Sequence, residues 1–210
     1  MQFMLKEQLP RHQELQLAGW KSRSYQPHFD GIEVPHFITF GLADSVPAGV
    51  IESWRRELDI SRSEDQIVLQ KRIDRYLDQG YGSAFLKDAR VAGIVQAALL
   101  KLDGERYRLS SWVVMPNHVH LLATRYDAHT IAEIMHSLTS FTSHKANKLL
   151  RRTGQFWMDD YFDRYILHAQ HYQRTLRYIE NNPVKARLCK EPADWPFSSA
   201  WFRANSKEVL

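Results

Sequence analysis

The middle of the chain carries a predicted β-hairpin that constrains the fold more than any other segment. In "RYRLSSWVVMPNHVHLLATR", residues 106–115 and 118–125 form two runs rich in β-forming side chains, joined by Pro116 and Asn117. Such runs favour strands, and the Pro-Asn pair favours a tight turn between them. The chain is therefore expected to contain an antiparallel pair of strands, with His118 and His120 at the start of the second.

The remaining patterns complete a sheet with helices. A strand is predicted at 34–43, and helical periodicity starts at Asp88 and ends at Asp103–Gly104. Thr130 and Glu133 form a capping-box pattern that opens the next helix. A strand at 162–167 precedes a last helix at 169–182, which Pro183 is expected to end. The order predicts an α+β, ferredoxin-like βαββαβ sheet with helices on one face and an added C-terminal helix.

The length of 210 residues suits one domain with extensions. We expect an N-terminal extension at 1–33, a single domain at 34–201 and a C-terminal tail at 202–210. Residues 45–87 interrupt the order after the first strand of the domain and are interpreted as an inserted helical segment.

Positive charge is concentrated in the C-terminal third. The whole chain has a net charge of +4, but ten basic and four acidic residues between His144 and Lys190 give that segment an excess of six. This excess is compatible with a solvated helix surface or with a face that binds phosphates.

The sequence favours a cytoplasmic protein. Cys189 is the only cysteine, so a disulfide within the chain and a cysteine-based metal site are excluded. The N-terminus lacks the apolar segment of a signal peptide, and "VAGIVQAALL" is too short to span a bilayer. No membrane partner is expected.

The two histidines are a candidate metal site. Alternate side chains of a strand share a face, so His118 and His120 point the same way, with Cα atoms about 6.5–7 Å apart. Their rings can converge on one ion. A bare His-x-His pattern is also common among ordinary sheet-surface histidines, and a metal site needs a third ligand.

The last helix offers that ligand and a nucleophile. At 100° per residue, Tyr178 and Asn182 are neighbours well off the apolar stripe, whereas Tyr172 lies on it and is expected to pack. The carbonyl oxygen of Asn182 suits Mg²⁺ or Mn²⁺. The Tyr178 hydroxyl would lie one turn away, and nearby basic side chains are candidates to bind a phosphate backbone: Arg174, Arg177, Lys185 and Arg187.

Four ordered motifs, "WVVMPNHVHLL", "FWMDDYFDRYI", "YIENNPVKARL" and "DWPFSSA", resemble those of the REP-associated tyrosine transposases of the His-hydrophobe-His superfamily. The resemblance covers about residues 34–201. It implies a ferredoxin-like fold, His118 and His120 as metal ligands, Tyr178 as the nucleophile and Asn182 as its motif asparagine. The segment at 45–87 and the N-terminal extension depart from the smaller members.

The resemblance implies an enzyme that uses Mg²⁺ or Mn²⁺, binds an imperfect palindromic DNA hairpin, and cleaves and rejoins single-stranded DNA through a 5′-phosphotyrosine link. It implies action as a monomer or as a homodimer, associated with the nucleoid in the bacterial cytoplasm. Two alternatives stay open: a non-catalytic DNA-binding regulator that keeps the hairpin-binding surface, and a metal-dependent nuclease that uses water.

Overall fold

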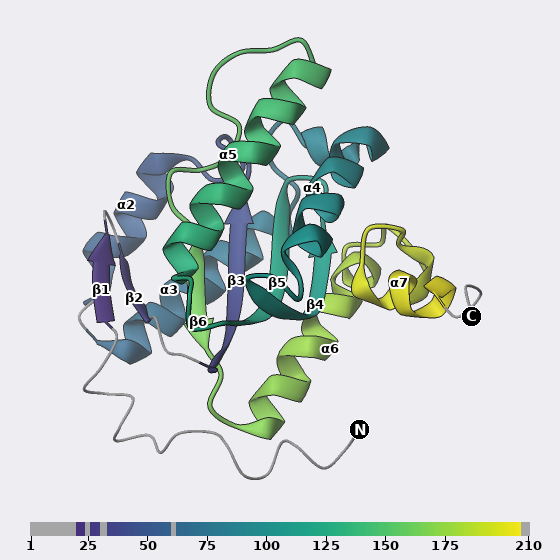
Figure 1. The fold of residues 1–210 in the computed structure, drawn as a ribbon. Helices are drawn as coiled ribbons and strands as arrows, with labels where there is room; N and C mark the ends of the chain where they lie inside the picture. The colour runs from purple at the N-terminus through teal and green to yellow at the C-terminus, as the bar shows by residue number, and fades with distance from the viewer. Residues whose placement is uncertain (1–19, 24–25, 30–32, 60–61, 207–210) are drawn as a thin grey trace.

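The computed structural model describes residues 20–23, 26–29, 33–59 and 62–206. Its centre is a four-stranded antiparallel sheet in the order β4-β5-β3-β6 (Figure 1). The strands are β3 (Pro35–Gly41), β4 (Tyr107–Val114), β5 (His118–Arg125) and β6 (Phe162–Tyr165). The hairpin predicted around Pro116 and Asn117 joins β4 to β5.

Two helices complete the βαββαβ arrangement. Helix α4 (Ala89–Leu102) connects β3 to β4, and helix α5 (Ile131–Leu149) connects β5 to β6. Asp88 caps α4, and Thr130 and Glu133 form the predicted capping box at the start of α5. Each βαβ unit leaves one strand between its two strands, as in a ferredoxin-like sheet. The predicted fold class is confirmed.

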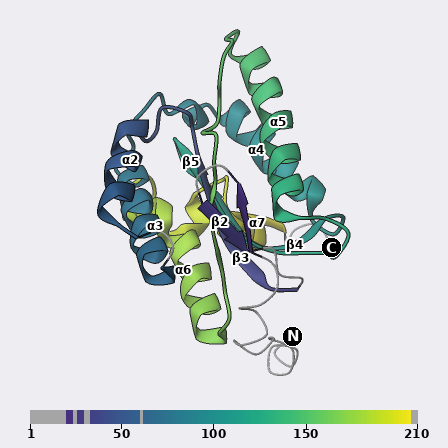
Figure 2. The same ribbon diagram turned by 90° about the vertical axis from the view of Figure 1, so that its left-hand side faces the viewer.

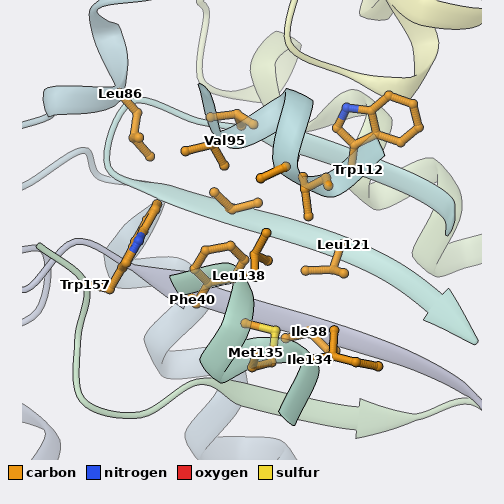
Figure 3. Close-up of a cluster of buried hydrophobic side chains, with 14 of the residues drawn as sticks. Ile38, Phe40, Leu86, Val95, Trp112, Leu121, Ile134, Met135, Leu138 and Trp157 are labelled. Atoms are coloured by element: carbon orange, nitrogen blue, oxygen red, sulfur yellow. The ribbon is translucent and has the colours of Figure 1, made fainter. Parts of the chain in front are cut away.

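Helices α4 and α5 cover one face of the sheet and bury the larger core (Figure 2). Ile38 and Phe40 of β3 and Leu121 of β5 meet Val95 of α4 and Leu138 of α5 there (Figure 3). The alternation along each strand therefore leaves the other set of side chains, including both histidines of β5, for the opposite face.

The opposite face is covered by helices from two distant parts of the sequence (Figure 2). Helix α6 (Ala169–Lys185) packs through Ile179 against Phe37, Val113 and Leu122 of the sheet. Helices α2 (Ala48–Glu57) and α3 (Ser63–Leu77) come from the segment at 45–87 and pack around Ile73 and Phe162. The segment ends in a short 3-10 helix, η1 (Phe85–Lys87).

The ends of the chain add small elements. Strands β1 (Trp20–Arg23) and β2 (Gln26–Phe29) pair in the predicted N-terminal extension, and the rest of residues 1–32 lies outside the described residues. After a 3-10 helix, η2 (Pro192–Asp194), helix α7 (Ser199–Asn205) crosses the expected boundary at 201. Glu180 of α6 accepts hydrogen bonds from Ser199 (2.9 Å) and Arg203 (2.5 Å), which fixes α7 against α6.

The predicted end of the last helix is wrong, because α6 continues through Pro183 to Lys185. Proline removes one backbone donor, but the Ala186 amide still donates to the Asn182 carbonyl at 2.9 Å, and Pro183 itself is buried. The helix ends where Arg187 adopts a left-handed backbone with φ of 58°. An arginine gives no sign of such an end in the sequence.

Candidate active site

His118 and His120 lie side by side on the face of β5 opposite the larger core, as the strand alternation predicts. Both side chains are buried, and their Nε2 atoms are 3.1 Å apart. Two ligand atoms bound at a right angle to one ion, each about 2.1 Å from it, have nearly this separation. The pair therefore has the spacing of adjacent ligands in an octahedral site.

Hydrogen bonds at the other ring nitrogens fix the orientation of both imidazoles. Asn117 donates through Nδ2 to the Leu77 and Tyr81 carbonyls, so its Oδ1, 2.7 Å from His118 Nδ1, accepts from that ring. His120 Nδ1 is 2.8 Å from Thr39 Oγ1, and this hydroxyl donates to Asp74 at 3.2 Å. Each Nδ1 thus carries the proton, and each Nε2 presents a lone pair.

Burial also keeps both rings neutral. It lowers the pKa of His118 to about 4, although the Asp78 carboxylate acts in the opposite direction. Burial, together with the neighbouring His118, lowers the pKa of His120 well below its ordinary value. Neutral imidazole is the form that binds metal, so the pair is prepared to bind an ion without first losing a proton.

Asp78 supplies a carboxylate to the pair, although no sequence motif indicates this role. It follows the last residue of α3, and its Oδ1 lies 4.0 Å from His118 Nε2. Asp78, His118 and His120 each offer one ligand atom, and these three atoms lie within 4.8 Å of one another. Only the packing of α3 on this face of the sheet brings Asp78 to the histidines, and no local motif marks that packing.

Asn182 and Tyr178 of α6 complete the group. Asn182 Nδ2 donates to Asp78 at 3.4 Å, whereas its buried Oδ1 has no hydrogen-bond partner among the described residues. The Tyr178 ring lies 5.4 Å from the His120 ring and 5.9 Å from that of Phe37, centroid to centroid. The helix thus brings the two residues chosen from the sequence to the histidines.

The prediction that Tyr178 and Asn182 lie away from the packed face of α6 is wrong, because the Asn182 side chain is buried and the Tyr178 side chain is half-buried. Asn182 is only 1% exposed, and Tyr178 is half-buried against the same cluster as the partly exposed Tyr172. Asn182 lies between the sheet and Asp78, the residue that follows α3, so the buried arc of α6 is wider than its apolar stripe. Thr175, another polar side chain of α6, is also buried.

A cleft with a volume of about 400 Å³ separates α3 from α6, and we call it the α3–α6 cleft. It is lined by Asp74 of α3, by Asp78 directly after α3, and by Tyr178 of α6. Burial and the neighbouring Asp78 raise the pKa of Asp74 to about 7. Burial and the two carboxylates raise the pKa of the Tyr178 hydroxyl, which therefore keeps its proton at neutral pH.

All four predicted phosphate-binding residues are exposed, but the structure places them differently. Arg174 and Lys185 line the α3–α6 cleft, whereas Arg177 and Arg187 do not. Lys185 Nζ lies 2.5 Å from an Asp78 oxygen, so its charge is already partnered.

Comparisons with known proteins find similarity to transposases. The model of the family "Transposase IS200 like" matches residues 89–182. A REP-associated tyrosine transposase of Escherichia coli (strain K12) is 26% identical over 109 residues, which are 50% of this chain and 62% of that protein. The predicted resemblance to the REP-associated tyrosine transposases is confirmed. The stretch that matches the Escherichia coli protein spans less than two thirds of that protein's length.

A solved structure also shares the fold. It is a REP-associated tyrosine transposase bound to a REP hairpin, which matches with a TM-score of 0.51 and 16% identity over 90% of this chain and 88% of that one. The segment matched by the transposase family model contains His118, His120, Tyr178 and Asn182, but Asp78 precedes it. Within the described residues, no helix combines the length and apolar character needed to cross a membrane.

Proposed function

We propose that the chain is a metal-dependent, transposase-type endonuclease and strand transferase. Its substrate would be single-stranded DNA with a REP-like palindromic hairpin, which it would cleave and rejoin through a 5′-phosphotyrosine intermediate. The observation that carries the proposal is the Tyr178 ring packed 5.4 Å from His120, in a site where two Nε2 lone pairs lie 3.1 Å apart. A regulator that only binds DNA would have no need of this arrangement.

His118, His120 and Asn182 would hold Mg²⁺ or Mn²⁺, with Asp78 as a further ligand. The donor set fits such an ion: two neutral imidazoles, one carboxylate and one buried amide oxygen that has no partner among the described residues. When bound, the ion would polarise the scissile phosphodiester and stabilise the charge of the leaving oxygen. The protein's own side chains carry out the remaining steps.

Tyr178 would act as the nucleophile. Its Oη forms a bond to phosphorus while the bond from phosphorus to the 3′-oxygen breaks, which leaves a 5′-phosphotyrosine and, after protonation, a free 3′-hydroxyl. Because burial raises the pKa of Tyr178, its proton needs an acceptor in the cleft. Asp74, which lines the same cleft and has a pKa of about 7, is the candidate acceptor. Attack by a 3′-hydroxyl on the phosphotyrosine reverses the step without ATP.

The DNA would bind along the exposed basic side chains of α6 and the segment after it. Arg174, Arg177 and Arg187 are free to contact phosphates at the surface, and Lys185 would have to exchange Asp78 for a phosphate. The relative of known structure is bound to a REP hairpin, which supports a hairpin as the partner of this chain. Either a monomer or a homodimer would act on it.

A covalent-adduct assay tests the proposal. The protein is incubated with single-stranded hairpin DNA and Mn²⁺ or Mg²⁺, and a denaturing gel resolves protein linked to DNA. We expect an adduct with the unmodified chain and with Tyr172→Phe, and none with Tyr178→Phe or after addition of EDTA. Cleavage without an adduct would identify a nuclease that uses water, and hairpin binding without cleavage would identify a regulator.

A further inference from the structure

Gln70 and Asp74 of α3, and Asp78 directly after it, line the α3–α6 cleft at intervals of four residues. Side chains four apart share one face of a helix, and eight residues span about 12 Å along its axis. Asp78 lies at the histidines, and Asp74 follows one turn away. The cleft therefore extends along α3 from the candidate metal site to Gln70, two turns distant.

The hydrogen bonds among the described residues do not account for the burial of the Gln70 amide. The residue is 6% exposed, and its Nε2 atom has no hydrogen-bond partner among the described residues. A buried amide donor without a partner costs folding free energy, so such groups commonly have a role with a ligand. Gln70 lines an open cleft, although its Nε2 atom is itself buried, so a molecule that enters the cleft can accept this hydrogen bond once the Gln70 side chain turns toward it.

The cleft walls suit a nucleotide. Lys71 and Arg75 of α3 and Arg174 of α6 are exposed cations on opposite sides, where they can bind backbone phosphates. Arg164 contributes a guanidinium to the same cleft, 5.9 Å from the centroid of the buried Phe37 ring. Aromatic rings and guanidinium planes are the groups on which the bases of single strands stack. The volume of about 400 Å³ lies within the range of small-ligand sites.

We propose that the α3–α6 cleft binds the nucleotide next to the bond that Tyr178 attacks, and that Gln70 selects its base. This inference rests on the proposed function. The Gln70 amide would donate to an acceptor on the edge of the base, while Lys71 and Arg75 hold the strand. The segment at 45–87, which supplies Gln70, Lys71 and Arg75, thereby becomes a specificity element of the site.

Base preference tests the role of Gln70 separately from catalysis. Hairpin substrates carry each of the four bases, or an abasic site, at each of the two positions that flank the scissile bond, and initial rates of adduct formation are measured. At one position the unmodified chain should prefer one base or base class over the abasic site by about tenfold, the size of one good base contact. Gln70→Met keeps the volume but removes the donor, and should abolish this preference.

Two further variants separate selection from folding. Gln70→Glu replaces the donor with an acceptor and should shift the preference toward bases that offer a donor. Gln155→Ala removes an exposed glutamine outside the cleft and should keep the preference of the unmodified chain. A structural role for Gln70 would lower all rates together without changing their ranking, so unchanged ranking in both Gln70 variants would overturn the assignment.

A binding measurement distinguishes the failure of this inference from that of the proposed function. If no substrate forms an adduct, the proposed function fails, and the same oligonucleotides are compared by fluorescence anisotropy. If the cleft binds this nucleotide, an abasic site at one of the two positions should weaken binding to the unmodified chain but not to Gln70→Met. Equal affinity of the unmodified chain for intact and abasic strands would refute it.

Discussion

Thr39 shows how one hydroxyl orients a candidate metal ligand. It accepts from His120 Nδ1 and donates to Asp74, which directs the Nε2 lone pair of His120 toward His118. Thr39→Val removes the hydroxyl at nearly constant volume and should weaken Mn²⁺ binding about tenfold, as loss of such outer contacts does. Isothermal titration calorimetry measures the affinity. Thr39→Ser keeps the hydroxyl and should restore most of the affinity, and equal Mn²⁺ affinity in Thr39→Val and the parent would contradict this role.

Asp74 makes the stability of the metal-free protein depend on pH. Its pKa is raised from 3.8 to about 7, so between these values the unfolded chain has released a proton that the folded chain retains. The free energy of unfolding therefore falls as pH rises through this window, and the penalty is complete above pH 7. Asp74→Asn, which can still accept from Thr39, should stabilise the protein by about 2–4 kcal/mol at pH 8 and by little at pH 4.

Urea unfolding in EDTA at the two pH values measures this difference. Asp127→Asn changes an exposed carboxylate and serves as the control. A gain from Asp74→Asn that is equal at pH 4 and pH 8 would mean that the Asp74 charge is not what destabilises the folded state.

At the scale of elements, α3 contributes a carboxylate to a site that β5 and α6 otherwise form. Asp78→Asn should therefore weaken Mn²⁺ binding by tenfold or more, because a carboxylate is a stronger ligand for a hard cation than an amide is. Asp78 also pairs with Lys185, so loss of that ion pair needs its own control. Lys185→Met breaks the pair but keeps the carboxylate, and should leave Mn²⁺ affinity equal or higher. Similar losses in both variants would assign the effect to the ion pair instead.

Local patterns predicted most elements because their signals are local. Asp88, Thr130 and Glu133 cap their helices within three residues, and the alternation along 118–125 sets the faces of β5. The end of α6 could not be predicted, because it depends on a left-handed arginine rather than on Pro183. Asp78 could not be predicted either, because it reaches the histidines through contacts between elements about 40 residues apart in the sequence.

At the scale of the whole molecule, the two faces of the sheet have different roles: one buries the larger core and the other carries the candidate active site. One face is covered by α4 and α5 (Figures 1 and 2) and buries the larger core, and the other holds the histidines, the α3–α6 cleft and Tyr178. The order of strands and helices predicts the sheet and its first face. The second face depends on α3 and α6 lying on either side of the α3–α6 cleft, and neither helix carries a pattern that indicates the other as its neighbour.

The C-terminal basic excess should make DNA affinity depend strongly on salt, because each phosphate contact releases counterions. Arg174→Gln and Arg177→Gln should each reduce the slope of log affinity against log salt by about 0.7 for a single strand. Lys185→Gln should change the slope less, because Asp78 already neutralises that lysine. Lys101→Gln changes an exposed lysine of α4, on the other face of the sheet, and should leave the slope unchanged. Anisotropy titrations from low to high salt measure these slopes. If neither arginine variant changes the slope while Lys101→Gln does, the DNA lies along α4 and α5, and the excess around α6 is only a solvated surface.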